Sequence, residues 1–579
     1  MLEVKRLAHP LPLGLLLLLF GAPFGVLHAQ APPFGEPTGR PGEPPPLQRE
    51  EPRPIPPPPI LQPLPPPPPT RELPLSRERV FVREIRIVGS TVFSAEELSQ
   101  VAAPYINREL TAEDLEALRV ALTLLYVNQG YVSSGAILPD QTVSEGIITY
   151  QIIEGELRGI TIEGNRWFRT GYLRRRLSLG AGPPLNVNTL QRQLQLLLED
   201  SRIARLTADL KAGLRPGESD LDVRVEDRSP FKLYLEFNNY QSPTVGAERG
   251  IVTLEDQNLT GNGDILTLRY GKSEGVDPLL DFTYSLPFTA RDTTLSLQYR
   301  RNTFTVVEEQ FKVLNIESNS EIYTVTLRKP VLRTLADEVA LELTGERLSN
   351  ETSLLGRPFS LSPGAQNGEE VATAVRATQE WIHRTQAQVL AVRSRFSLGV
   401  DALGATLNSH RGGIPDSRFF AWLGQFQWVQ RLPLLDTQLI FRSDLQLSAN
   451  PLLVLEQVAV GGRYSVRGYR ENTLVRDNAF LTSLEARVPL VRASRWADYL
   501  ELAPFVDYGR GWQTSQPTPD VLDIASVGIG LRWAATVRVP FPVRPQLEVY
   551  WGVPLRNLKT PGGNLQDMGL HLQFILAAF

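Results

Sequence analysis

Residues 229–579 alternate apolar and polar side chains, as do strands with one apolar and one polar face. One run intersperses Phe231, Leu233, Leu235 and Phe237 with Lys232, Tyr234, Glu236 and Asn238. Similar runs occupy residues 281–288, 295–300, 323–328 and 439–447. At roughly 20 residues per strand and connection, the stretch predicts about 16 strands, an even number that can close into an antiparallel barrel. A soluble sandwich would alternate in the same way, but so many runs without a compact domain break favour a transmembrane β-barrel.

The N-terminus carries the features of an export signal. Lys5 and Arg6 precede an apolar run over residues 11–20, and the small residues Ala29 and Ala31 follow. This order predicts a secretory signal peptide at residues 1–29. A short transmembrane anchor is the alternative, but Pro12, Gly14, Pro23 and Gly25 interrupt the apolar run and its continuation.

A proline-rich stretch comes next. Residues 31–70 hold 19 of the 47 prolines in the chain. Proline lacks an amide donor and favours extended polyproline II, so residues 30–79 are predicted to be a linker. A ligand for a proline-binding domain is the alternative. The prolines also disfavour a helix here that could plug a pore.

Between the linker and the alternating stretch, one order of elements, β-α-α-β-β, occurs twice. In residues 80–155 it comprises a strand over Val80–Val88, helices starting at Ser94 and Thr111, and strands at 136–138 and 147–154. In residues 156–228 it comprises a strand at 159–163, helices at 170–179 and 188–198, and strands at 206–210 and 221–225. We therefore expect two α+β modules of about 75 residues each.

Motifs in the first module resemble a known family. The run Val88-Gly89-Ser90-Thr91-Val92-Phe93-Ser94, and Ala136-Ile137-Leu138-Pro139 followed by Gln141 and Gly146, resemble the first POTRA (polypeptide-transport-associated) domain of two-partner secretion transporters. The run Asn258-Leu259-Thr260-Gly261-Asn262-Gly263-Asp264, expected in the first hairpin connection, resembles the N-L-x-G-x-G-D signature of that family's barrel. The resemblance implies periplasmic POTRA domains that bind an unfolded exoprotein, and a barrel in outer-membrane lipid. Pairing of an extended chain with an exposed strand edge suits such binding.

Arg467 lies in a glycine-rich run between predicted strands, where an unpaired guanidinium would be costly. Val466-Arg467-Gly468-Tyr469 matches the VRGY tetrad of the same superfamily, which implies a loop folded back into the lumen. Phe505-Val506-Asp507-Tyr508-Gly509 matches its F-x-D-x-G strand motif, and Glu485 resembles the acidic residue of the preceding strand. A guanidinium pairs bidentately with a carboxylate, so we expect Arg467 to bind Asp507, with Glu485 as a possible second partner. These motifs predict a loop–barrel lock; an exposed loop arginine is the alternative.

Other site classes find little support in the sequence. The chain has no cysteine and five histidines without ligand spacing, so neither a metal nor a cofactor is expected. A net charge of −4 does not suggest a nucleic-acid partner. Residues 271–275 match G-x-S-x-G, but they join two predicted strands, whereas a nucleophile elbow requires a following helix. No enzyme activity is expected.

The resemblance, together with these features, implies outer-membrane translocation of a partner exoprotein, a large adhesin or cytolysin, by a monomeric transporter. An assembly insertase of the same superfamily and a passive porin are the alternatives. The final residue, Phe579, resembles the C-terminal residue of many outer-membrane barrels. Its position is out of phase with Leu570, Leu572, Phe574 and Leu576, so either a bulge shifts the register or the chain leaves the last strand before it.

Overall fold

The computed structural model describes Leu61 and residues 79–143, 145–408, 413–515, 521–538, 542–558 and 562–579. The predicted signal peptide and, apart from Leu61 and Arg79, the predicted linker lie outside the described residues. Leu61 donates its amide to Oε1 of Gln191 at 3.1 Å and pairs in parallel with Ala208. Within these ranges, no helix is both long enough and apolar enough to span a membrane.

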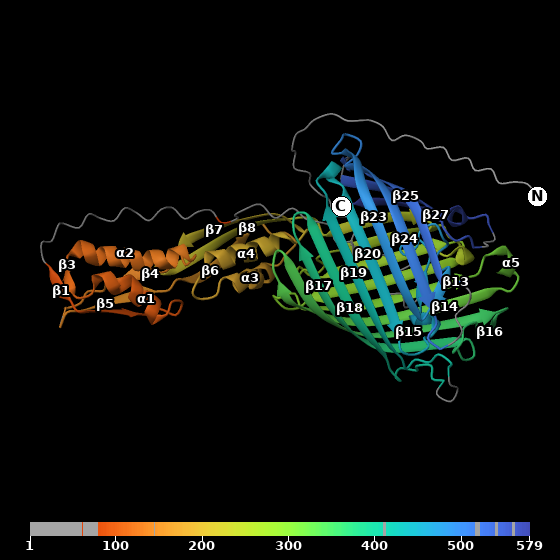
Figure 1. Ribbon diagram of the computed structural model, residues 1–579, viewed down its shortest axis with the longest axis horizontal. Coiled ribbons are helices and arrows are strands. Elements are labelled where there is room, and N and C mark those ends of the chain that lie inside the picture. Colours follow the sequence, from red (N-terminus) through yellow and green to blue (C-terminus); the bar gives the residue numbers. More distant parts are fainter. Residues whose placement is uncertain are drawn as a thin grey trace, which may run out of the picture. The chain divides into compact units, whose positions relative to one another are not determined.

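The first module contains two helices and two small sheets (Figure 1). Its elements are β1 (Val80–Val82), β2 (Glu84–Val88), α1 (Ala95–Ala102), β3 (Arg108–Leu110), α2 (Ala112–Asn128), β4 (Gly135–Ile137) and β5 (Ile147–Ile153). Capping boxes at Ser94 and Thr111 begin the two helices, because each hydroxyl accepts an amide that has no partner within the helix.

The prediction of one strand over Val80–Val88 is wrong. The amides of Arg83 and Glu84 both donate to the carbonyl of Gly146, at 2.7 and 3.2 Å, and this bend divides the run. β1 then pairs with β3, whereas β2 pairs in parallel with β5 in the sheet β2-β5-β4.

The second module repeats this plan. It comprises β6 (Glu156–Glu163), α3 (Thr170–Leu177), α4 (Val187–Leu198), β7 (Ile203–Ala212) and β8 (Glu218–Asp227), with the sheet order β6-β8-β7. The Arg169 amide donates to the Gly261 carbonyl at 2.9 Å, and Arg202 donates to the Gly263 carbonyl at 2.9 Å. The glycine-rich run 258–264 is therefore a contact of this module. It joins β10 to β11, the second hairpin of the barrel rather than the first as predicted.

Sixteen antiparallel strands close the barrel in the described part of the chain, which confirms the predicted fold class (Figure 1). They are β9 (Phe231–Asn238), β10 (Arg249–Asp256), β11 (Ile265–Ser273), β12 (Val276–Pro287), β13 (Thr294–Thr305), β14 (Ile316–Arg333), β15 (Asp337–Leu354), β17 (Glu369–Arg384), β18 (Gln388–Gly399), β19 (Phe420–Arg431), β20 (Gln438–Ser448), β23 (Asn478–Arg492), β24 (Tyr499–Trp512), β25 (Asp523–Ala534), β27 (Pro542–Pro554) and β28 (Leu570–Ala578). The short β16 (Arg357–Pro358) and β26 (Val537–Arg538) extend two of the connections.

The alternation sorts side chains between the two faces of the barrel wall. Phe282 on β12 is exposed on the outer face, whereas its neighbour Asp281 faces inward and binds Arg300 of β13 at 3.2 Å. An apolar outer face and a polar interior are what a barrel surrounded by lipid requires.

The barrel closes where β28 meets β9, and this seam is short. Six residue pairs join the two strands, from Gln573–Asn238 to Ala578–Leu233, whereas seventeen pairs join β14 to β15. The side chain of Asn239 extends the seam: it accepts the Leu572 amide at 2.7 Å and donates to the Leu570 carbonyl at 2.9 Å. Phe579 follows the end of β28, whose pairing with β27 is unbroken, so the chain leaves the strand and no bulge is present there.

Candidate functional site

The connection between β20 and β23, residues 449–477, contacts the inner wall of the barrel. It contains the small hairpin β21 (Val458–Val460) and β22 (Leu474–Arg476) and the VRGY tetrad between them. Arg467 is 3% exposed, and its partners lie on inward-facing positions of β23 and β24. The loop therefore folds back into the lumen, and Arg467 is not exposed.

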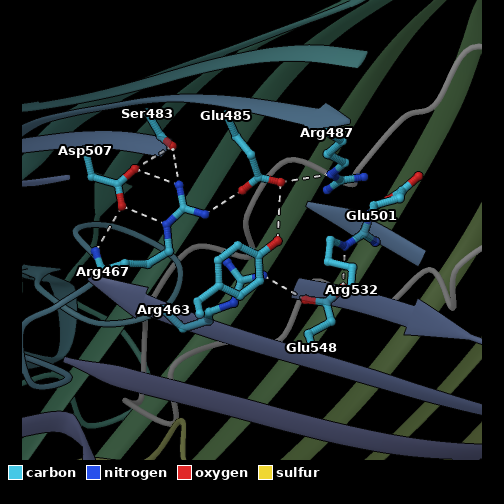
Figure 2. Close-up of polar contacts among 10 residues, drawn as sticks. Arg463, Arg467, Ser483, Glu485, Arg487, Glu501, Asp507, Arg532 and Glu548 are labelled. Atoms are coloured by element: carbon cyan, nitrogen blue, oxygen red, sulfur yellow. Dashed lines mark hydrogen bonds and ion pairs between the residues drawn. The ribbon is translucent and has the colours of Figure 1, made fainter. Parts of the chain in front are cut away.

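The guanidinium of Arg467 binds two carboxylates and a hydroxyl (Figure 2). Its Nε and Nη2 donate to the two oxygens of Asp507 at 2.7 and 2.8 Å, which is the bidentate geometry. Nη1 donates to Glu485, and Nη2 also donates to Ser483 at 3.0 Å. The backbone amide of Arg467 adds a bond to Asp507 at 3.0 Å. The structure thus brings Arg467, Asp507 and Glu485 into one cluster.

The three characteristic residues of F-x-D-x-G on β24 face the lumen together and contact the loop. The Phe505 ring lies 3.6 Å from Cζ of Arg467, a cation–π contact. Asp507 supplies the carboxylate. A Cβ on Gly509 would lie 2.8 Å from Cγ2 of Val466, so glycine leaves the space that Val466 occupies. Period-two spacing on one strand explains why these residue types recur at alternate positions.

The last two residues of the tetrad contact other strands. Gly468 has a φ of +89°, and a Cβ there would lie 2.8 Å from the backbone of Gly552 on β27. Its amide donates to Nε2 of His571 on β28 at 3.1 Å. The hydroxyl of Tyr469 lies 3.0 Å from the Ala525 carbonyl oxygen on β25. The tetrad therefore contacts β23, β24, β25, β27 and β28 within four residues.

A second ionic network lies beside the first and was not identified from the sequence (Figure 2). Arg463 of the loop binds Glu548 on β27 at 2.8 Å, and its Cζ lies 4.0 Å from the Tyr550 ring centroid. Glu548 also binds Arg532, which binds Glu501 at 2.7 Å. For Glu548, Arg532 and Glu501 the sequence signal was their inward-facing position on a strand, which identifies a residue facing the lumen but not its partner on the loop.

This arrangement can hold a loop in place. The cations and anions of the cluster are buried and mutually paired, so removing one member leaves its partner uncompensated, at a cost of about 3–5 kcal/mol. Among the described residues, no three histidine, aspartate or glutamate side chains are placed to hold a metal ion.

Comparisons with known proteins agree with this architecture. A family model described as haemolysin secretion/activation protein ShlB/FhaC/HecB matches residues 217–533, and one described as POTRA domain, ShlB-type, matches residues 80–155. The outer membrane transporter CdiB of Dickeya dadantii is 25% identical over 406 residues, which cover 67% of this chain and 69% of that protein.

Two solved structures share the fold. That of CdiB from Escherichia coli superposes with a TM-score of 0.64 at 19% identity, over 87% of this chain and 91% of the other. The structure of BamA from Haemophilus ducreyi lacking POTRA domains 1–3 superposes with a TM-score of 0.50 at 15% identity. The superposition covers 86% of this chain and 99% of that one.

Proposed function

The chain belongs to the haemolysin secretion/activation protein family, and from that premise we propose how this outer-membrane two-partner secretion transporter moves its exoprotein. The POTRA domains lie in the periplasm. In the proposal they bind the exoprotein while it is unfolded, and the chain then passes through the lumen of a single barrel embedded in outer-membrane lipid. The loop carrying Arg467 holds the closed state and moves when the exoprotein arrives.

The buried cluster at Arg467 is the observation that carries this proposal. A permanent structural loop could be held by apolar packing alone, at a lower desolvation cost than buried charges incur. Ionic contacts in a lumen can instead exchange for water when the loop moves. Sixteen-stranded barrels enclose an aqueous channel, so displacing the loop would open a path for an extended chain.

Exposed strand edges support binding of an unfolded chain by the POTRA domains. In the first domain the sheet order β2-β5-β4 leaves β2 and β4 at its edges. Val88 on β2 is 49% exposed and Ile137 on β4 is 38% exposed. An extended segment can pair with such an edge through its backbone, largely independently of its sequence.

The test uses a strain that lacks this chain and is complemented with variants. Mass spectrometry of the culture medium should show one large exoprotein that is lost on deletion and restored by the wild type. Removal of residues 80–228 should abolish its export, and Arg467→Ala should strongly reduce it. Normal export by the truncated chain would contradict the POTRA step, and normal export by Arg467→Ala would contradict the lock.

A further inference from the structure

The loop has a second buried attachment, in the arm that precedes β21. Glu456 in this arm is 7% exposed, and its Oε1 accepts a hydrogen bond from Nη2 of Arg376 on β17 at 2.8 Å. Arg376 is itself 3% exposed. It also binds Glu346 on β15, through Nε at 2.8 Å and Nη2 at 2.6 Å, and Ser397 on β18 at 2.8 Å.

Apolar contacts place the same arm on the same part of the wall. Leu453 and Leu455, 0% and 3% exposed, form one buried cluster with Ile322, Leu348 and Ala372 of β14, β15 and β17. The arm therefore rests on β14 to β18, whereas the VRGY tetrad rests on β23 to β28. In the barrel order, only β19 and β20 lie between these two surfaces among the described strands.

The two attachments have opposite charge. At the tetrad the loop supplies the cation and the wall supplies the anions, whereas at Glu456 the loop supplies the anion and the wall supplies the cation. We infer that the Glu456–Arg376 pair is a second anchor of the loop, which is thereby tied at two places on the lumen wall and opens the path only when both anchors release. The inference deepens the proposed function and rests on it.

The other partners of Arg376 on the barrel wall allow Glu456 to separate from it. When Glu456 leaves, Arg376 keeps its two bonds to Glu346 and is not left without a counter-charge. Glu456 passes from a buried site to water, where a free carboxylate is well solvated. An attachment of this kind can break and re-form without a large penalty on the wall side.

Glu346 also provides the matched control. Glu456→Gln and Glu346→Gln each remove one carboxylate from the same arginine, but only the first removes a contact between loop and wall. Purified full-length wild type, Arg467→Ala, Glu456→Gln and Glu346→Gln are inserted into planar lipid bilayers, and the fraction of time spent in the conducting state is measured in potassium chloride. Heat-modifiable migration on gels checks that each barrel is folded.

We expect Glu456→Gln to raise the ratio of open to closed time at least tenfold, which corresponds to about 1.4 kcal/mol of closing free energy. Glu346→Gln should stay close to the wild type. Equal effects of the two substitutions, or no effect of Glu456→Gln, would overturn the inference. If Glu456→Gln does not assemble, Leu455→Ala replaces it, because it trims the apolar contact of the arm and keeps every charge; a wild-type open fraction would then overturn the inference.

Failure of the proposed function gives a different result. If Arg467→Ala leaves both conductance and exoprotein export unchanged, the loop does not close a path and the proposed function fails together with the inference. If Arg467→Ala opens the channel while both Glu456→Gln and Leu455→Ala behave as wild type, the proposed function stands and the second anchor alone is refuted.

Discussion

Replacing Arg467 with alanine should detach the VRGY tetrad from the wall without unfolding the barrel. The chain has no cysteine, so a single Val466→Cys substitution reports on this local opening. Val466 is 0% exposed and packs over Gly509. Cysteine behaves as a small apolar residue at such a site, and a thiol reagent reaches it only when the loop leaves the wall.

The expected size of the effect follows from the hydrogen bonds of the arginine side chain. Arg467→Ala removes four of them, two to Asp507, one to Glu485 and one to Ser483. Asp507 keeps the Ser483 hydroxyl at 2.7 Å but loses its counter-charge, whereas Glu485 keeps the Arg487 guanidinium at 2.8 Å. The cost should therefore lie near the lower end of the range for a broken buried pair, about 3 kcal/mol. At 1.4 kcal/mol per factor of ten, the loop should open about 100-fold more often.

The assay compares the labelling rate of Val466→Cys with and without Arg467→Ala, in purified folded protein. Glu380→Gln is the control, because Glu380 pairs with Arg393 and Arg328, which both belong to the barrel wall rather than to the loop. We expect the control to label at the parental rate. A rate for Arg467→Ala within about threefold of the parent, below about 0.7 kcal/mol, would refute the assignment of the closing energy to this cluster.

Three further substitutions test other contacts. Phe505→Leu removes the ring whose centroid lies 3.6 Å from Cζ of Arg467 and should speed labelling of Val466→Cys about 30-fold, because a desolvated cation–π contact contributes about 2 kcal/mol; an unchanged rate would show that the ring only fills space. Gly552→Ala places a Cβ 2.7 Å from the Gly468 amide nitrogen and should also unseat the loop, whereas Gly345→Ala, with open space around its Cβ, should not; equal labelling of the two variants would contradict the close approach. In the first POTRA domain, burial raises the pKa of Glu154, but hydrogen bonds from Thr91, Val92 and Tyr126 outweigh it and hold the pKa below its usual range. Its stabilising effect is therefore present at neutral pH and lost as the pH falls through the folded-state pKa. Glu154→Gln should lower the melting temperature of this domain at pH 7, by a margin that shrinks in acid; a margin independent of pH would exclude a role for the charge.

The barrel and the helix caps could be predicted from the sequence more completely than the contacts of the site. Period-two alternation identifies the faces of a strand locally, so inward and outward residues such as Asp281 and Phe282 could be assigned before any strand was paired. The bend at Arg83 could not be predicted in this way, because it depends on the carbonyl of Gly146, which is distant in the sequence. The contact of Arg467 with Asp507 could be anticipated from two motifs and the chemistry of a buried guanidinium. The pairs of Arg463 and Glu456 could not, because many inward-facing arginines and glutamates offer equivalent partners until the loop is positioned.

The short seam between β9 and β28 links the loop to the continuity of the barrel wall. With six residue pairs, this junction is the shortest between neighbouring strands of the ring in the described part of the chain, so it should separate at a lower free energy than the longer junctions. The loop reinforces that weak junction from inside: Gly468 donates to His571 on β28, and the Glu471 amide donates to Gln566, whose side chain donates to the Gln241 carbonyl beyond β9 at 2.8 Å. If the loop moved out of the lumen, its hydrogen bonds to the residues at this junction would break at the same time. Movement of the loop out of the lumen should therefore also weaken the junction between β9 and β28.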